Sequence, residues 1–306
     1  MALLRSAFLT LARSRCLRHL SENSGAGRRL ASRFVAGTDI DDALEAAQAL
    51  TRQNVAVTLD SLGENVGTPE EAGRAAQVYH RLLDAISAQG LGANISVKLT
   101  QMGVDLDPSL ALELVTSLVT HAAAAGSFVR VDMESSAYTE STLHLVRAVH
   151  AAGHRDQIGV VIQAYLRRSE GDVSGLLEDG ISIRLCKGAY EEPASLAFPE
   201  KSAVDENFLR LMKMLLVSGT RHAIATHDER MIAATRRFAQ ERGLPPSAFE
   251  FQMLYGIRRD LQRALAAEGY HVRVYLPFGT DWYPYFMRRL AERPANALFL
   301  AKNILR

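Results

Sequence analysis

The feature that most constrains the fold is an alternation of eight short apolar runs with longer helical segments. The runs are rich in β-branched residues, as strands are, and lie at residues 55–60, 94–98, 128–132, 158–163, 181–185, 222–226, 249–253 and 272–275. Helical periodicity indicates helices at residues 39–53, 70–89, 108–125, 141–152, 204–217, 228–242 and 258–267. The connections are too long for hairpins, so the strands should be parallel. Eight such units predict an α/β fold, a closed (β/α)₈ TIM-type barrel.

An open doubly wound sheet is the alternative fold for this alternation. Such sheets commonly carry Gly-x-Gly-x-x-Gly after a strand, and no predicted strand here is followed by that motif. We therefore expect one barrel domain at residues 54–306, preceded by N-terminal helices at residues 1–53 that pack on the barrel.

The composition excludes several classes of protein. A net charge of +1 and 23% charged residues do not indicate nucleic-acid binding. Cys16 and Cys186 are far apart and have no metal-ligand spacing, so neither a disulfide framework nor a metal site is expected. No apolar run is long enough to cross a membrane. A cytoplasmic location fits best.

The first 34 residues are rich in Arg and Ser and contain one acidic residue, Glu22. This composition fits an organellar transit peptide, which would direct the protein to mitochondria. It also fits a basic amphipathic helix of the mature protein, with Leu4, Phe8 and Leu11 on one face. We favour the helix, whose basic face would suit peripheral contact with anionic lipid of the inner membrane.

Polar side chains follow almost every predicted strand at its carboxyl end, where active sites of such barrels lie. In chain order they are Asp60, Lys98, Asp132 with Glu134, Gln163, Arg184 with Lys187, Thr226 with His227, Gln252 and Tyr275. Lys98 ends an apolar strand, and a buried ammonium needs a partner. Asp132 on the neighbouring strand is the natural one, in a buried ion pair or in an active site. Asp60 either belongs to this site or caps the next helix.

Residues 184–190, RLCKGAY, combine two cations with a turn of small residues. Backbone N–H groups at Gly188 and Ala189 could approach a pyrophosphate closely, and Lys187 would offset its charge. Residues 226–229, THDE, read either as part of this site or as a capped helix start with Thr226 as the cap. His227 has no second ligand at metal spacing, so no metal is expected there.

Residues 271–293 read as a strand that ends at Tyr275, a turn at Pro277 and a helix. Helical spacing places Tyr285, Arg288, Arg289 and Glu292 on one side of that helix. A phenol and two guanidiniums beside a strand-end phenol suit a small ligand that carries a carboxylate.

In combination these motifs resemble the single-function bacterial type of the proline dehydrogenase family. The resemblance is carried by RLCKGAY at residues 184–190, ATH at 225–227, FEFQMLYG at 249–256, YLPFGT at 275–280 and YFMRRLAE at 285–292. It extends over nearly all the chain from about Arg33 onward. It implies a distorted (β/α)₈ barrel with non-covalent FAD that oxidises L-proline to 1-pyrroline-5-carboxylate and passes electrons to a membrane quinone. That reaction is the first step of proline degradation to glutamate.

The resemblance also implies roles for individual residues. The substrate would be bound by Lys98, Tyr275, Tyr285, Arg288 and Arg289, with Leu254 packed on its ring and Tyr190 closing the pocket. FAD would be bound by Met133, Gln163, Lys187, Gly188, Ala189, Thr226 and His227. Arg184 would act near flavin N5, and Asp132 would orient Lys98 or Tyr275. Glu64 would pair with Arg288 as a gate, and Glu292 matches the motif without an assigned role.

Two other functions remain open on the same barrel. Lys98 could serve as the Schiff-base nucleophile of a lyase or aldolase, or the barrel could bind an amino acid without catalysis. The sequence does not specify the oligomeric state, the quinone site, the strength of membrane attachment or activity on hydroxyproline.

Overall fold

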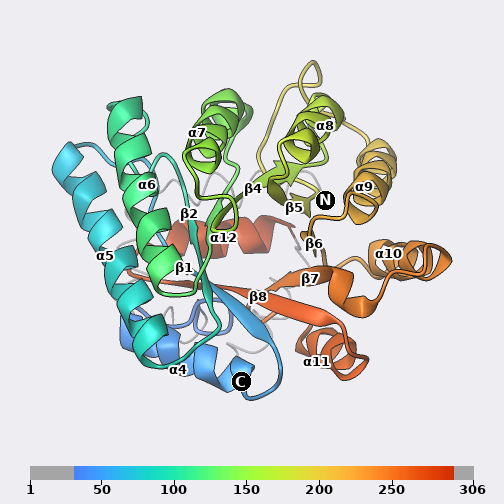
Figure 1. Ribbon diagram of the computed structural model, residues 1–306, viewed down its shortest axis with the longest axis horizontal. Coiled ribbons are helices and arrows are strands. Elements are labelled where there is room, and N and C mark those ends of the chain that lie inside the picture. The colour runs from blue at the N-terminus through green and yellow to red at the C-terminus, as the bar shows by residue number, and fades with distance from the viewer. Residues whose placement is uncertain (1–30, 293–306) are drawn as a thin grey trace.

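The computed structural model describes residues 31–292, with side chains described as far as Met287. At its centre, eight parallel strands form a closed barrel in chain order (Figure 1). The strands are β1 Ala56–Ser61, β2 Asn94–Val97, β3 Val129–Val131, β4 Ile158–Gln163, β5 Ser182–Cys186, β6 His222–Ala225, β7 Phe249–Leu254 and β8 His271–Phe278. The barrel predicted from the alternating pattern is confirmed.

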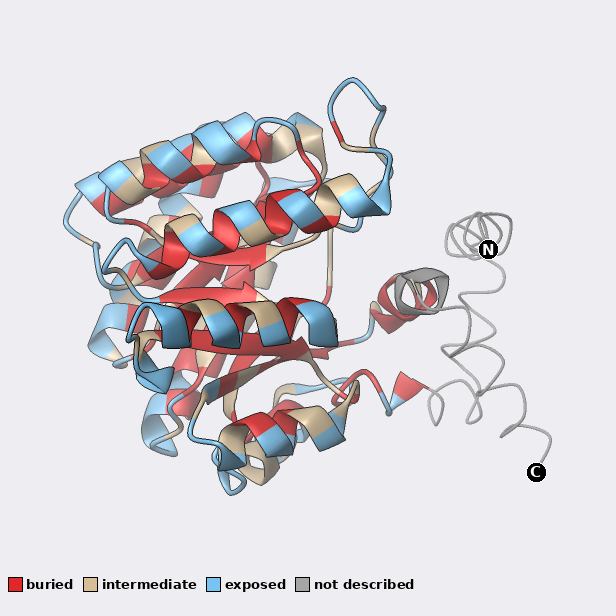
Figure 2. Cartoon of the chain, turned by 90° about the vertical axis from the view of Figure 1, so that its right-hand side faces the viewer, coloured by how far each residue is buried: buried red, intermediate tan, exposed pale blue. Residues whose placement is uncertain are grey.

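All the helices except the last surround the barrel in the order of the chain, and the last crosses the barrel axis (Figure 1). They are α4 Ile40–Thr51, α5 Pro69–Ala88, α6 Pro108–Ala124, α7 Thr139–Ala151, α8 Ser169–Glu178, α9 Lys201–Leu216, α10 Glu229–Glu241, α11 Arg259–Ala267 and α12 Trp282–Glu292. Their inner faces are buried and their outer faces exposed (Figure 2). Each large aliphatic side chain buried in this way contributes roughly 1.5–3 kcal/mol to folding.

Helix α8 was not predicted from the sequence. It is short, and Gly171 and Gly175 lie inside it, where glycine disfavours a helix. Its only buried apolar side chains are Val173 and Leu176, so its apolar face is too small for a clear helical period.

The segment before β1 packs directly on the barrel. Helix α4 packs against β1 and β8 through Ala43, Leu44 and Ala47. The predicted boundary between residues 53 and 54 stays a prediction, and the predicted basic helix lies outside the described residues.

Helix α12 lies over one open end of the barrel. It crosses the barrel axis in Figure 1 and lies beyond the strands in Figure 2. Trp282 and Phe286 of this helix form a small apolar cluster with Phe34 and Leu62. Tyr285 of the same helix lines the cavity at the carboxyl ends of the strands.

Candidate active site

A cavity of about 520 Å³ opens at the carboxyl ends of the strands, a volume typical of small-molecule sites. Its lining includes every described residue that was assigned to the substrate, the cofactor or catalysis: Lys98, Asp132, Met133, Gln163, Arg184, Lys187, Gly188, Ala189, Thr226, His227, Tyr275 and Tyr285. The strand-end residues Asp60 and Glu134 are buried and do not line it. Glu64, Tyr190 and Leu254 also line it. The side chains of Arg288, Arg289 and Glu292 lie outside the described residues, although α12 contains all three.

Lys98 lies just beyond β2 and is 8% exposed. Its Nζ lies 3.0 Å from Oδ1 of Asp60 and 3.9 Å from Oδ2 of Asp132. Burial alone would lower the pKa of Lys98, but the charges of Asp60 and Asp132 outweigh burial and raise it. Lys98 therefore stays protonated. Its predicted partner Asp132 is the more distant of the two carboxylates.

The alternative in which Asp60 caps the next helix is wrong. Asp60 is fully buried beside Lys98, and Thr68 caps α5 by accepting a hydrogen bond from the backbone N–H of Glu71. Burial raises the pKa of Asp60, and the charge of Lys98 opposes that rise.

Asp132 connects three donors in the cavity. Its Oδ1 accepts from Ser96 Oγ at 2.7 Å and from Nη1 of Arg184 at 2.8 Å, and its Oδ2 accepts from the Tyr275 hydroxyl at 2.8 Å. Burial raises the pKa of Tyr275, and the charges of Asp132 and Asp60 raise it further. Tyr275 therefore stays protonated and donates, which fixes its ring over the barrel mouth.

Arg184 is held on two sides within the barrel. Besides Asp132, it donates through Nε to Oε1 of Gln252, and its guanidinium lies 5.4 Å from the centre of the Tyr275 ring. At 6% exposure it presents a fixed positive charge to the cavity. Such a charge stabilises negative charge that develops on a bound molecule.

Lys187 belongs to a charged cluster at the cavity rim. Its Nζ contacts Asp205 at 2.5 Å and Asp228 at 2.8 Å, and Lys201 contacts Asp205 from the outside at 2.5 Å. Burial would raise the pKa of Asp205, but hydrogen bonds from Lys187 and Lys201 lower it overall. Both carboxylates are thus ionised, and they position the two ammonium groups at the rim.

The alternative in which Thr226 caps the following helix is wrong. Asp228 is the N-cap of α10 and accepts from the backbone N–H of Arg230. Thr226 Oγ1 instead accepts from the backbone N–H of Asp228 at 3.1 Å. His227 accepts through Nε2 from the backbone N–H of Leu254 at 2.9 Å, so its ring proton is on Nδ1.

A comparison with protein families decides the relationship of this chain. The model of the family described as proline dehydrogenase matches residues 43–302. The chain belongs to the proline dehydrogenase family.

Relatives in this family resemble the chain along its whole length. Proline dehydrogenase 1 of Bacillus subtilis strain 168 is 42% identical over 304 residues, which cover 99% of this chain and all of the relative. Proline dehydrogenase of Deinococcus radiodurans is 44% identical over 280 residues, or 90% of each chain. The resemblance stated from the motifs is therefore confirmed.

Solved structures of larger proteins share the fold. Proline utilization A (PutA) from Bdellovibrio bacteriovorus, inactivated by N-propargylglycine, superposes with a TM-score of 0.83 at 26% identity. The match covers 95% of this chain and 36% of that one. This chain thus corresponds to one part of the larger protein. None of the helices between residues 31 and 292 combines the length and the hydropathy that a membrane-spanning helix needs.

Further residues of the site were not assigned a role from the sequence: Gln252 and Lys201 line the cavity, and Ser96 contacts Asp132 and Arg184. Gln252 was noted only as a polar strand end, and its contact with Arg184 depends on how two distant strands face each other. Ser96 lies two positions before Lys98 on β2, where the strand period points both side chains inward. Lys201 begins α9 and reaches the cavity rim; no local sequence signal separates it from a surface lysine.

Gly188 is required by the shape of the cavity wall, and the Gly188→Ala variant should lose stability. Its φ is +110°, and a Cβ there would lie 2.2 Å from the ring of Tyr165. Backbone strain of this kind costs roughly 1–3 kcal/mol, and overpacking adds about 1–3 kcal/mol more. Gly153→Ala is the matched control, because φ is +111° and a Cβ would meet nothing within 4 Å. Denaturant unfolding should show the larger loss at position 188; equal losses would contradict the close packing.

Proposed function

We propose that this chain oxidises L-proline to 1-pyrroline-5-carboxylate with non-covalent FAD and passes the electrons to a membrane quinone. This would be the first step of proline degradation to glutamate. The observation that carries the proposal is the group around Asp132, which holds Arg184 and Tyr275 in one cavity of a proline dehydrogenase barrel.

The residues present fit a flavin. The cavity combines a fixed guanidinium at Arg184 and an amide at Gln163 with a wall at Gly188 that excludes any side chain. Lys187 and Lys201 at the rim provide ammonium groups suited to phosphates. Bound FAD would accept the hydride from the proline ring carbon next to nitrogen.

The residues of the chain would bind and orient the substrate. Lys98, Tyr275 and Tyr285 line the same cavity as Arg184, so the residues proposed to bind the substrate and those proposed to bind the cofactor share one cavity. Asp132 keeps Tyr275 in place by accepting a 2.8 Å hydrogen bond from its hydroxyl. Such positioning supplies much of the rate enhancement when the cofactor provides the electron acceptor.

Arg288 and Arg289 are proposed to bind the carboxylate of proline. Each Arg→Met variant should raise KM for proline with a smaller effect on kcat, by roughly 1–3 kcal/mol per lost charged contact. Steady-state kinetics with proline as the varied substrate measures this. Arg263→Met on α11 is a control, because Arg263 is an exposed helix residue whose Nε donates to the carbonyl of Arg259 in its own helix. Unchanged kinetics in both variants would rule out binding of the carboxylate by Arg288 and Arg289.

The Schiff-base alternative is disfavoured by the protonation of Lys98. A nucleophilic lysine needs a lowered pKa, whereas the charges of Asp60 and Asp132 raise the pKa of Lys98 above its usual value despite burial. The other alternative is a barrel that binds an amino acid without catalysis, and formation of product would exclude it.

The direct test is product formation. Purified protein supplied with FAD, L-proline and a soluble quinone should form 1-pyrroline-5-carboxylate and reduced quinone in equal amounts, detected by mass spectrometry and absorbance. Product formed only with an artificial dye acceptor would retain the oxidation of proline and rule out the quinone. Binding of proline without any product would favour the binding barrel. Sedimentation with anionic vesicles tests the proposed peripheral membrane contact separately.

A further inference from the structure

Arg184 is held from behind by a chain of buried polar residues. Its Nε donates to Oε1 of Gln252, and Nε2 of Gln252 donates to Oε1 of Glu250. Gln252 and Glu250 lie two positions apart on β7, so both side chains point to the barrel interior, where they are 4% and 8% exposed. Glu250 in turn accepts from Nε of Arg273 at 3.0 and 3.2 Å.

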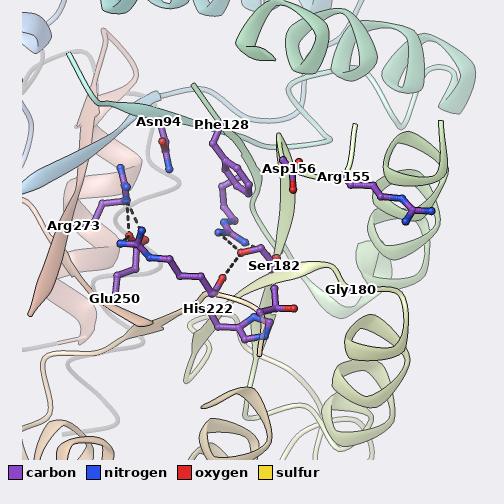
Figure 3. Close-up of a pocket in the computed structure, with 12 residues that line it drawn as sticks. Asn94, Phe128, Arg155, Asp156, Gly180, Ser182, His222, Glu250 and Arg273 are labelled. Carbon is purple, nitrogen blue, oxygen red and sulfur yellow. Dashed lines mark hydrogen bonds and ion pairs between the residues drawn. The ribbon is translucent and has the colours of Figure 1, made fainter. Parts of the chain in front are cut away.

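Glu250 and Arg273 lie at the opposite end of the barrel from the candidate active site. They line a second cavity, of about 380 Å³, together with Asn94, Ser182 and His222, which begin their strands (Figure 3). Arg273 and Glu250 face each other there (Figure 3). Because Gln252 lines the active-site cavity, the contacts run through the barrel from one end to the other.

The charge of Glu250 fixes the orientation of the Gln252 amide. Burial would raise the pKa of Glu250, but the charge of Arg273 and the hydrogen bonds from Gln252 and Arg273 lower it overall. An ionised carboxylate only accepts hydrogen bonds. The amide of Gln252 must therefore point its NH₂ group at Glu250 and its carbonyl oxygen at Nε of Arg184. Glutamine at position 250 would replace one acceptor oxygen by an NH₂ donor and remove the charge that pairs with Arg273, so it would hold the Gln252 amide less firmly.

We propose that Glu250 is a positioning residue for Arg184, acting through Gln252, and that it sets the reduction potential of the flavin from the far end of the barrel. This inference rests on the proposed function, because it requires a flavin bound beside Arg184. A fixed guanidinium stabilises the negative charge of the reduced flavin better than a mobile one, since no reorganisation is needed.

The Glu250→Gln variant, purified with FAD, tests the proposal through the midpoint potential of the bound flavin. The equilibrium for flavin reduction should become about tenfold less favourable, which is a potential about 30 mV lower for a two-electron couple. The dissociation constant of a proline analogue that carries the ring and carboxylate should change by less than about twofold. Ser182→Ala is the matched control: Ser182 lines the same cavity but contacts Arg130 and the carbonyl of Arg221 instead of Gln252. Its potential should equal that of the wild type.

Testing Glu250→Gln in the Arg184→Lys protein separates an effect on the position of Arg184 from a general loss of stability. Lysine at position 184 lacks the Nε that binds Gln252, so Glu250→Gln should have little further effect on the potential in Arg184→Lys. If Glu250→Gln does not fold, Gln252→Leu breaks the same chain while leaving Glu250 paired with Arg273, and should lower the potential in the same way.

The outcomes distinguish the inference from the proposed function. If the wild type loads with flavin but the midpoint potential is unchanged in Glu250→Gln and Gln252→Leu, the inference alone is overturned. An equal shift of the potential in Ser182→Ala would also overturn it. So would a shift from Glu250→Gln that is as large in the Arg184→Lys protein as in the wild type. A wild-type protein that cannot be loaded with flavin would overturn the proposed function and the inference with it.

Discussion

The Asp132→Asn variant is expected to lose roughly 10²–10³-fold in kcat/KM for proline, as enzymes do when one fixed polar group of the active site is removed. The carboxylate accepts three hydrogen bonds, from Ser96, Arg184 and Tyr275, at 2.7–2.8 Å. Asparagine of the same size must point its NH₂ donor at one of these donors. It also leaves the charge of Arg184 without its ionised partner, which is costly in the barrel interior.

Asp105→Asn provides the matched control for this prediction. Asp105 accepts a hydrogen bond from the hydroxyl of Tyr138 at 2.9 Å, so it repeats the contact between Asp132 and Tyr275. Asp105 is exposed and does not line the cavity. Its kcat/KM should stay within about twofold of the wild type. Steady-state kinetics on flavin-loaded proteins measures both variants, and comparable values for the two would show that Asp132 does not organise the site.

The Lys98→Met variant is expected to lose roughly 3–5 kcal/mol of unfolding free energy at neutral pH, the usual cost of breaking a buried ion pair from one side. Asp60 is fully buried and would lose its ammonium partner, leaving it beside the neutral hydroxyls of Tyr79, at 3.4 Å, and Tyr275. The double variant Lys98→Met with Asp60→Asn should recover most of the loss, because no buried charge remains unpaired. Urea unfolding of both variants tests this. Arg147→Met, which breaks an exposed pair with Asp179, should cost less than about 1 kcal/mol.

The stability loss in Lys98→Met should also depend on pH in a defined direction. Burial raises the pKa of Asp60 in the wild type, and Lys98 opposes that rise. Without Lys98 the folded-state pKa rises further above the unfolded value of about 4. Below that pH the carboxyl is neutral in the folded and unfolded states, so the variant loses least unfolding free energy there. The difference in unfolding free energy from the wild type should widen as the pH rises toward the folded-state pKa of Asp60 in the variant. A difference that stays constant as the pH rises from about 4 would argue against an unpaired Asp60.

The sequence predicted the architecture because each β/α unit repeats the same local signals. Strand β4 occurs at the predicted residues, and the other strands differ from prediction by a few residues at their ends. The periodicities of strands and helices are local properties, so they can be recognised in a single sequence. Helix α8 was missed for the same reason, since its two buried apolar residues do not generate a clear period.

The contacts inside the candidate site were only partly predictable. Lys98 could be recognised as a buried cation, but its position between β1 and β3 gives it carboxylate neighbours on both sides, Asp60 and Asp132. Choosing the nearer one requires the stagger between strands, which the sequence does not encode locally. The contact of Arg184 with Gln252 joins β5 to β7, and the N-cap of α10 is Asp228, not the alternative Thr226.

The central claim is most directly tested by the visible absorbance of the flavin during anaerobic titration with L-proline. Protein loaded with FAD should lose the flavin absorbance as proline is added, and Asp132→Asn should lose it far more slowly. Glycine, an amino acid without a ring, should leave the spectrum of the wild type unchanged. A loaded protein whose flavin absorbance does not respond to proline, or a folded protein that cannot be loaded with FAD, would contradict the account.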